Sequence, residues 1–167
     1  MAEIVYLSLG SNLGDREELL RQATARLAEM DGLTLVAESS LYQSPALGLV
    51  TGGRDFLNKS IKVECRLDPA ELLRRTEKLE RDLGRTDKGL HADRVIDVDI
   101  LLFGELIFRT ERLEIPHPRM SQRAFVLLPL AELTPDLIDP RTDAFFSDLL
   151  EKTGQQGVTL YKEKIRV

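Results

Sequence analysis

The chain has 167 residues, a hydrophobic share of 43%, a charged share of 31% and a formal net charge of −5 at pH 7. These values are typical of a single globular domain over residues 1–167, and they exclude a disordered or fibrous chain. An acidic chain also lacks the overall basic charge on which non-specific nucleic-acid binding relies. We therefore expect no nucleic-acid partner.

The N-terminus has no basic segment before an apolar stretch, and no apolar run approaches the ~18 residues of a membrane span. We expect neither a signal peptide nor a membrane partner. The chain has one cysteine, Cys65, in the alternating apolar run 61–65. Because a single cysteine forms no internal disulfide, this pattern predicts a buried strand residue in a cytoplasmic protein.

The first half of the chain predicts three strands and one helix. A strand is expected over 4–9, ending at Gly10, and Asp15 is expected to cap a helix whose apolar residues recur at helical spacing. Residues 33–41 and 56–66 predict two further strands. Between them, residues 44–53 contain one proline and three glycines and predict a flexible loop.

The second half begins with Asp68 and Pro69, which predict the start of a helix over 70–83 that ends before Gly84. A polar loop over 85–93, a strongly apolar strand over 95–103, a short arm at 106–108 and helices at 121–130 and 145–150 follow, with a last strand at 158–161. The core order is strand, helix, strand, strand, helix, strand. This order predicts an α+β fold, a ferredoxin-like α/β sandwich whose mainly antiparallel sheet carries its helices on one face, with a helical addition.

Two aspartates interrupt the apolar strand 95–103. Alternate strand residues share a face, so Asp97 and Asp99 are expected to project together, roughly 6–7 Å apart. The intervening residues are expected to face a core: Ile96, Val98, Ile100 and Leu102. Neighbouring buried carboxylates repel each other, and a divalent cation offsets that cost, which favours Mg²⁺. A solvated strand end with the aspartates capping nearby amides is the alternative.

Basic side chains surround this pair in the sequence: Arg85, Arg94, Arg112, His117, Arg119 and Arg123. Arginine forks match phosphate oxygens, and arginine with Mg²⁺ is typical of phosphoryl-transfer sites. A single arginine is commonly a solvated surface charge, so the prediction depends on the group.

His117 lies between two prolines, which restrict the backbone on either side. A stiff segment would present its imidazole to donate a hydrogen bond to a phosphate or to protonate a leaving oxygen. A structural role is the alternative for His117. His91, in the polar loop, is expected to be solvated.

The acceptor side of such a site is expected from aromatic and amide side chains. Phe56 and Phe125 are candidates to sandwich a planar heterocycle, and Asn58 shares a strand face with Phe56. The alternative is that both phenylalanines are core residues.

Seven segments together resemble one family. They are Leu9–Asp15, Tyr42–Gly48, Phe56–Asn58, Glu80–Arg85, Arg94–Leu101, Ile115–Pro118 and Arg123–Leu127. Their order, between about residues 4 and 138, is that of the hydroxymethyldihydropterin pyrophosphokinases of folate synthesis.

This resemblance implies that the pterin's hydroxymethyl oxygen attacks the β-phosphorus of ATP, AMP leaves and the pterin takes the pyrophosphate. It implies two Mg²⁺ ions held by Asp97 and Asp99, with Asp97 favoured as the proton acceptor. It also implies two loops that close over the substrates. We expect a monomer.

The resemblance assigns the remaining residues by role. The residues expected to bind ATP are Glu80, Arg94, Ile100, Arg112, His117 and Arg123. The residues expected to bind the pterin are Ser44, Pro45, Leu47, Phe56, Asn58 and Phe125. The residues expected in catalysis are Asp97, Asp99, Arg85, Arg94 and His117.

The chain departs from the family in three places. Residues 88–93 replace a common Arg-Trp-Gly-Pro sequence, Asp87 stands where a second arginine often occurs, and Glu114 stands where a hydroxyl residue can hold the nucleotide. Two alternatives follow. One is a non-catalytic module of this fold that binds a small ligand or RNA, against which the acidic charge and the 5% aromatic content count. The other is a phosphotransferase with another acceptor, or a slow, divergent paralogue.

Overall fold

The computed structural model describes residues 1–46, 54–85 and 95–164. The helices are α1 (Arg16–Glu29), α2 (Pro69–Asp82), α3 (Ala124–Leu133) and α4 (Phe146–Thr153), with a 3₁₀ turn, η1, at Met120–Gln122. The strands are β1 (Glu3–Ser11), β2 (Leu33–Glu38), β3 (Leu41–Ser44), β4 (Phe56–Cys65), β5 (Asp97–Phe103), β6 (Phe108–Arg109), β7 (Glu114–Ile115) and β8 (Thr159–Lys162). Within the described residues, no helix is long and apolar enough to cross a membrane.

The main sheet has the strand order β5-β1-β4-β3-β8, and β2 pairs with β4 beside β3. All of its pairings are antiparallel. The hairpin of β6 and β7 forms a separate two-stranded sheet. The long strands β1 and β4 lie at the centre, so β5 is an edge strand that is held by β1 on one side only.

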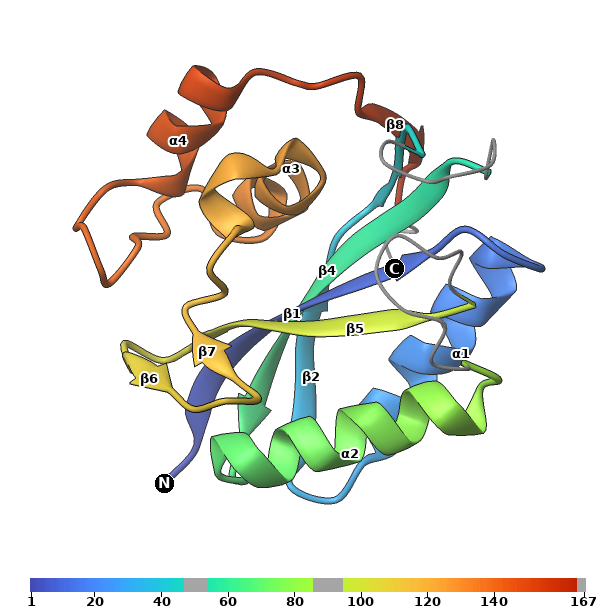
Figure 1. Ribbon diagram of the computed structural model, residues 1–167, viewed down its shortest axis with the longest axis vertical. Coiled ribbons are helices and arrows are strands. Elements are labelled where there is room, and N and C mark those ends of the chain that lie inside the picture. The colour runs from blue at the N-terminus through green and yellow to red at the C-terminus, as the bar shows by residue number, and fades with distance from the viewer. Residues whose placement is uncertain (47–53, 86–94, 165–167) are drawn as a thin grey trace.

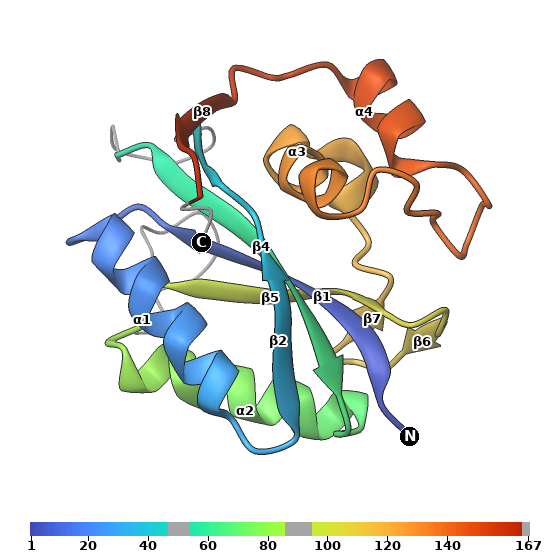
Figure 2. The same ribbon diagram turned by 180° about the vertical axis from the view of Figure 1, so that it is seen from behind.

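Helices cover both faces of this sheet. In the first apolar cluster, α1 and α2 pack against residues such as Leu7, Leu9 and Ile61. In the second cluster, α3 and α4 pack against Tyr6 and neighbouring residues. Figures 1 and 2 show α1 and α2 together on one side of the sheet and α3 and α4 on the other. The predicted ferredoxin-like α+β fold is confirmed, and the helical addition covers the face opposite α1 and α2.

The segment 33–41, predicted as one strand, forms two. Ser39 and Ser40 lie between β2 and β3. Ser39 still bonds to β4, where its N–H donates to the Ser60 carbonyl at 2.9 Å, whereas Ser40 bonds to α3. The Ser39 hydroxyl accepts the Ser60 N–H at 2.9 Å, and the Ser40 N–H donates to the Glu132 carboxylate at 2.9 Å. The strand is interrupted where Ser40 bonds to Glu132, a residue distant in the sequence, which a local pattern does not reveal.

Other elements begin or end a few residues away from their predicted bounds. β1 continues through Gly10 to Ser11, and β5 begins at Asp97. The arm predicted at 106–108 is the β6–β7 hairpin, and the helix predicted at 121–130 is η1 followed by α3. The last helix and strand each lie within three residues of their predicted bounds.

β5 contains an irregularity that reverses the facing of its last residues. Leu7 pairs with Ile100 and Tyr6 pairs with Leu102, which leaves Leu101 between them. Such a bulge adds one residue and shifts the alternation of faces. The prediction that Leu102 shares the face of Ile100 is therefore wrong, since Leu102 belongs to the second cluster, under α3.

Capping side chains fix the starts of α1 and α2, as predicted. Asp15 accepts the Glu18 N–H at 3.1 Å, and Asp68 accepts the Glu71 N–H at 2.8 Å. Each bond satisfies one amide that has no partner inside its helix. After α2, Gly84 has φ = 104°, a conformation that other residues rarely adopt.

We expect Asp68→Ala to lower the free energy of unfolding by about 1 kcal/mol, because the Glu71 amide loses its acceptor. Asp68→Asn is the matched control, since an asparagine oxygen also caps, and it should retain most of the stability. Urea unfolding at neutral pH measures both. Equal stability of Asp68→Ala and the unsubstituted chain would show that this cap adds nothing.

Candidate active site

Three strands bring Asn58, Gly10 and Asp97 into one row. Gly10 of β1 pairs with Asn58 of β4 on one side and with Asp97 of β5 on the other. Directly opposed residues on antiparallel strands project from the same face. A Cβ on Gly10 would lie 3.3 Å from the Asn58 amide oxygen. Glycine at this position therefore leaves a space on the sheet surface between the amide and the carboxylate.

A second row lies two residues further along and contains Ser60, Ser8 and Asp99. Both serines are buried. Ser8 and Gly10 share a face with Tyr6, which packs under α3, so both rows lie on the side of the sheet that α3 covers.

The predicted alternation of β5 is confirmed around the two aspartates. Val98 and Ile100 are buried in the cluster with α1 and α2, whereas Asp97 and Asp99 are half-buried on the opposite face. The two carboxylates therefore project together from an otherwise apolar edge strand.

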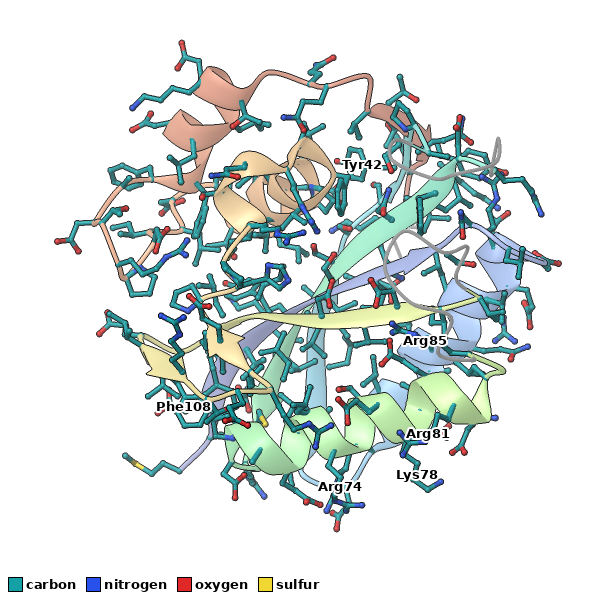
Figure 3. All side chains as sticks on the ribbon, viewed as in Figure 1. Tyr42, Arg74, Lys78, Arg81, Arg85 and Phe108 are labelled. Carbon is teal, nitrogen blue, oxygen red and sulfur yellow. The ribbon has the colours of Figure 1, made fainter. Side chains whose placement is uncertain are left out.

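Arg85 connects the end of α2 to this strand. Its guanidinium donates to the Asp97 carboxylate at 2.9 Å and also to Glu80, and Figure 3 shows it between α2 and β5. Glu80 is buried and accepts the Val98 N–H at 3.1 Å. Burial raises the pKa of Glu80, the Arg85 guanidinium opposes this shift, and the Asp97 carboxylate adds to it. Glu80 thus holds both the Arg85 guanidinium and the backbone of β5 in place.

A cleft of about 750 Å³ lies between β5 and the β6–β7 hairpin. Four of the predicted site residues line it: Asp99, Ile100, Arg112 and His117. Its size and mixed lining are typical of a pocket for a small ligand. Apolar side chains at Leu73 and Leu113 supply a surface for a planar base, and the cationic and imidazole groups suit phosphates.

The hairpin also brings residues to the cleft that the sequence did not single out. Arg109 lines it, and so does Glu114, which was noted only as a departure from the family. Arg112, which was predicted, also lines the cleft, and its guanidinium pairs with Glu77 of α2 at 2.6 and 2.8 Å. The predicted arm ended at 108, so Arg109 was missed. Extending the hairpin by its period-2 alternation would have indicated it.

His117 is fixed by hydrogen bonds at both its backbone and its ring. Its N–H donates to the Leu101 carbonyl at 2.9 Å, and its Nδ1 accepts the Arg119 N–H at 3.2 Å. Burial, together with the nearby Arg123 charge, lowers the pKa of His117 to about 4. The ring is therefore neutral near pH 7, and a proton on Nε2 follows from the acceptor role of Nδ1.

The structure brings together three of the residues predicted to bind the pterin. The Asn58 amide nitrogen donates to the Ser44 hydroxyl at 2.8 Å and to the Tyr42 carbonyl at 3.4 Å, and both Asn58 and Ser44 are buried. Phe56 pairs with Ser44 in register and reaches the space above Gly10. The Asn58 amide oxygen faces the same space.

Phe125 and Arg123 lie where α3 begins. The Arg123 guanidinium lies 5.5 Å from the centre of the Phe125 ring, within range of a cation–π interaction. Phe125 is half-buried against the second cluster, on the site's side of the sheet. Pro45 directly follows β3.

Several sequence predictions lie outside the described residues. They concern Leu47, Arg94 and His91, and the departures at Asp87 and residues 88–93.

The donor set at β5 fits a magnesium ion better than a closed structural metal site. Among the described residues there is no group of three or more His, Cys, Asp or Glu side chains that could hold a metal. A structural zinc site requires four such ligands, whereas Mg²⁺ takes one or two carboxylates and completes its shell with water and phosphate. Asp97 and Asp99, beside a phosphate-compatible cleft, provide such a pair.

A pair of carboxylates beside a cleft lined by arginines and a histidine, on a ferredoxin-like α+β fold, fits the class of enzymes that transfer a phosphoryl-type group from a nucleotide. Comparisons with known proteins identify the family. Residues 6–135 match the family model described as 7,8-dihydro-6-hydroxymethylpterin-pyrophosphokinase.

Relatives of similar length share much of the sequence. The chain is 41% identical to the 2-amino-4-hydroxy-6-hydroxymethyldihydropteridine pyrophosphokinase of Bacillus subtilis over 164 residues, 98% of this chain and 93% of that protein. It is 40% identical to the enzyme of the same name from Aquifex aeolicus over 136 residues, 81% of this chain and 83% of that protein.

The fold is also found in solved structures. A crystal structure of Plasmodium falciparum HPPK-DHPS with pteroate superposes with a TM-score of 0.73 over 91% of this chain and 42% of that chain, at 16% identity. At that identity, the match supports the fold alone.

The chain belongs to the 7,8-dihydro-6-hydroxymethylpterin-pyrophosphokinase family. It is therefore a diphosphotransferase of folate biosynthesis, which uses ATP to pyrophosphorylate hydroxymethyldihydropterin. The resemblance inferred from the sequence is confirmed, and the non-catalytic module is set aside.

The lowered pKa of His117 predicts a specific loss of stability in acid. The folded chain takes up this proton only near pH 4, whereas an unfolded histidine takes it up near pH 6.5. Lowering the pH through this window therefore favours the unfolded state. Between pH 7 and pH 5, the chain should lose about 2 kcal/mol more stability than His117→Gln, which has no imidazole to protonate.

Urea unfolding of both proteins at the two pH values gives this difference, and titration of the carboxylates, common to both, cancels. Equal losses in the two proteins would show that His117 titrates in the fold as it does in water.

Proposed function

We propose that pyrophosphate transfer takes place across the surface above Gly10, with ATP on the Asp99 side and the pterin on the Asn58 side. The observation that supports this proposal is the strand register. Asp97 lies in the row of Asn58, which belongs to the polar pocket of β3 and β4. Asp99, two residues along the same strand face, lines the cleft beside His117. β5 would thus contact both substrate sites through two of its side chains.

On the acceptor side, the Asn58 amide would read the polar edge of the pterin, with its orientation fixed by Ser44. Phe56 and Phe125, from opposite walls, would enclose the planar rings. Pro45 and Leu47 are proposed to complete the pocket, largely through their backbone.

On the nucleotide side, Ile100 would contact the base and the neutral His117 would donate a hydrogen bond to a phosphate oxygen. Arg112, Arg123 and Arg94 are proposed as further phosphate or ribose contacts, with Glu80 acting through the groups it holds in place. Arg85, already beside Asp97, would meet the phosphates at the reacting end.

The reaction joins the hydroxymethyl oxygen of the pterin to the β-phosphorus of ATP and breaks the bond from that phosphorus to the oxygen it shares with the α-phosphate. AMP leaves with the electron pair of that bond. Asp97 shares a row with the pterin-side amide and is proposed to receive the hydroxyl proton, while Arg85 stabilises charge on the phosphates. Mg²⁺, proposed as two ions held by Asp97 and Asp99, would supply neutralising charge and lower the pKa of the attacking hydroxyl.

We also propose that residues 1–167 form one domain and act as a cytoplasmic monomer. The buried, free thiol of Cys65 suits a reducing compartment.

The reaction is tested by incubating the chain with ATP, Mg²⁺ and the reduced hydroxymethyl pterin and separating the nucleotide products. AMP should form in equal amount to the pyrophosphorylated pterin. Release of ADP would point to an ordinary kinase, and absence of both products would contradict the proposal.

In the same assay, Asp97→Asn and Asp99→Asn should each lower turnover by roughly 10³-fold or more, since each removes a charge that holds the metal and balances the phosphates. Asp136→Asn is the matched control, because Asp136 is exposed beyond the end of α3, and it should retain full turnover. Near-normal turnover of either β5 variant at ordinary Mg²⁺ would overturn the metal assignment.

A further inference from the structure

Glu132 lies near the end of α3 and binds across to the strand β3. Its carboxylate accepts the Ser40 N–H at 2.9 Å, the Ser40 hydroxyl at 3.3 Å and the Tyr42 hydroxyl at 2.7 Å. Figure 3 shows Tyr42 beside α3. Burial raises the pKa of Tyr42, and the Glu132 carboxylate adds to the shift, so the phenol remains a donor.

The C-terminal segment joins the same group. β8 pairs with β3, the Lys164 N–H donates to the Ser40 hydroxyl at 3.1 Å, and the Lys164 ammonium lies 3.9 Å from Glu132. Three segments that are distant in the sequence therefore meet at one carboxylate.

The stability of α3 does not explain why an acidic residue occupies position 132. A negative charge in the last turn of a helix faces the negative end of the helix dipole, which is unfavourable. This carboxylate is also about three-quarters buried, with 24% of the side chain exposed, so its charge depends on hydrogen-bond donors from outside the helix. These donors are Ser40, directly before β3, and Tyr42 of β3, and the Lys164 ammonium of the C-terminal segment lies nearby.

The two elements that Glu132 joins, α3 and β3, both contribute residues to the proposed acceptor pocket. α3 carries Phe125 in its first turn. β3 carries Ser44, and Tyr42 lies opposite Asn58 in register, where its carbonyl accepts the Asn58 amide at 3.4 Å. A change in the spacing of α3 and β3 would move the ring of Phe125 relative to the amide of Asn58.

We propose that Glu132 is a positioning residue for the pterin. Its hydrogen bonds to Ser40 and Tyr42 set the distance between Phe125 on α3 and the polar side chains of β3 and β4, Ser44 and Asn58. The proposal rests on the placement of the pterin beside Asn58. It involves no contact between Glu132 and either substrate, and the nucleotide cleft lies on the other side of the two aspartates.

The conservative variant Tyr42→Phe tests this proposal, since it removes one hydroxyl and keeps the ring. The KM for the pterin should rise about fivefold or more, because the pocket must be ordered during binding, while the KM for ATP and kcat stay within twofold. Tyr161→Phe is the matched control. Its hydroxyl makes no hydrogen bond that the structure records within the described residues, and it should leave all three constants unchanged.

Glu132→Gln, which keeps one oxygen acceptor, should act in the same direction. The double variant should raise the KM for the pterin by less than the product of the two single effects, because both substitutions break the same contact. Thermal unfolding of each variant, measured alongside, confirms that the kinetics refer to folded protein.

Equal rises in both KM values, or a lower kcat alone, would indicate a general structural role and overturn the proposal, as would an unchanged pterin KM in Tyr42→Phe. The activity of the unsubstituted chain distinguishes a failure of this proposal from a failure of the proposed function. If it releases no AMP, the proposed function fails. If it is active and the variants match it, only the role of Glu132 fails.

Discussion

Repulsion between two carboxylates on one strand is the constraint around which this site is arranged. Asp97 and Asp99 share a face of an edge strand whose other face is apolar. Their positions hold because β5 is secured by its pairing with β1 and by Glu80, whose carboxylate accepts hydrogen bonds from both the Val98 N–H and Arg85. Removing the charge of one of these four side chains would change the electrostatic interactions of the other three.

The two faces of the sheet have different tasks. The cluster with α1 and α2 contains most of the large buried side chains and holds the strands in register. The opposite face carries buried polar groups such as Ser8, Ser60 and Asn58 beneath α3. Polar groups on that face require partners, and a bound substrate can supply some of them. The location of the site thus follows from which face carries polar residues at alternate strand positions.

Local chemistry made part of this structure predictable. The caps at Asp15 and Asp68 and the alternation around Val98 depend on neighbours a few residues away, and these predictions are confirmed. The facing of Leu102 depends on a bulge in the pairing with β1, so no local pattern reveals it. Likewise, the row through Gly10 and the contacts of Glu132 join residues far apart in sequence, and only the folded register shows that they meet.

In the proposed mechanism, Asp97 and Asp99 hold a divalent cation together with the phosphates. Electron paramagnetic resonance of Mn²⁺, with a non-hydrolysable ATP analogue present, measures this binding directly. We expect Mn²⁺ to bind the complex of the unsubstituted chain, and Asp97→Asn and Asp99→Asn each to weaken that binding at least tenfold. Mn²⁺ binding of equal strength in all three proteins would contradict a role of the two aspartates in holding the metal and would place the cation on the nucleotide alone.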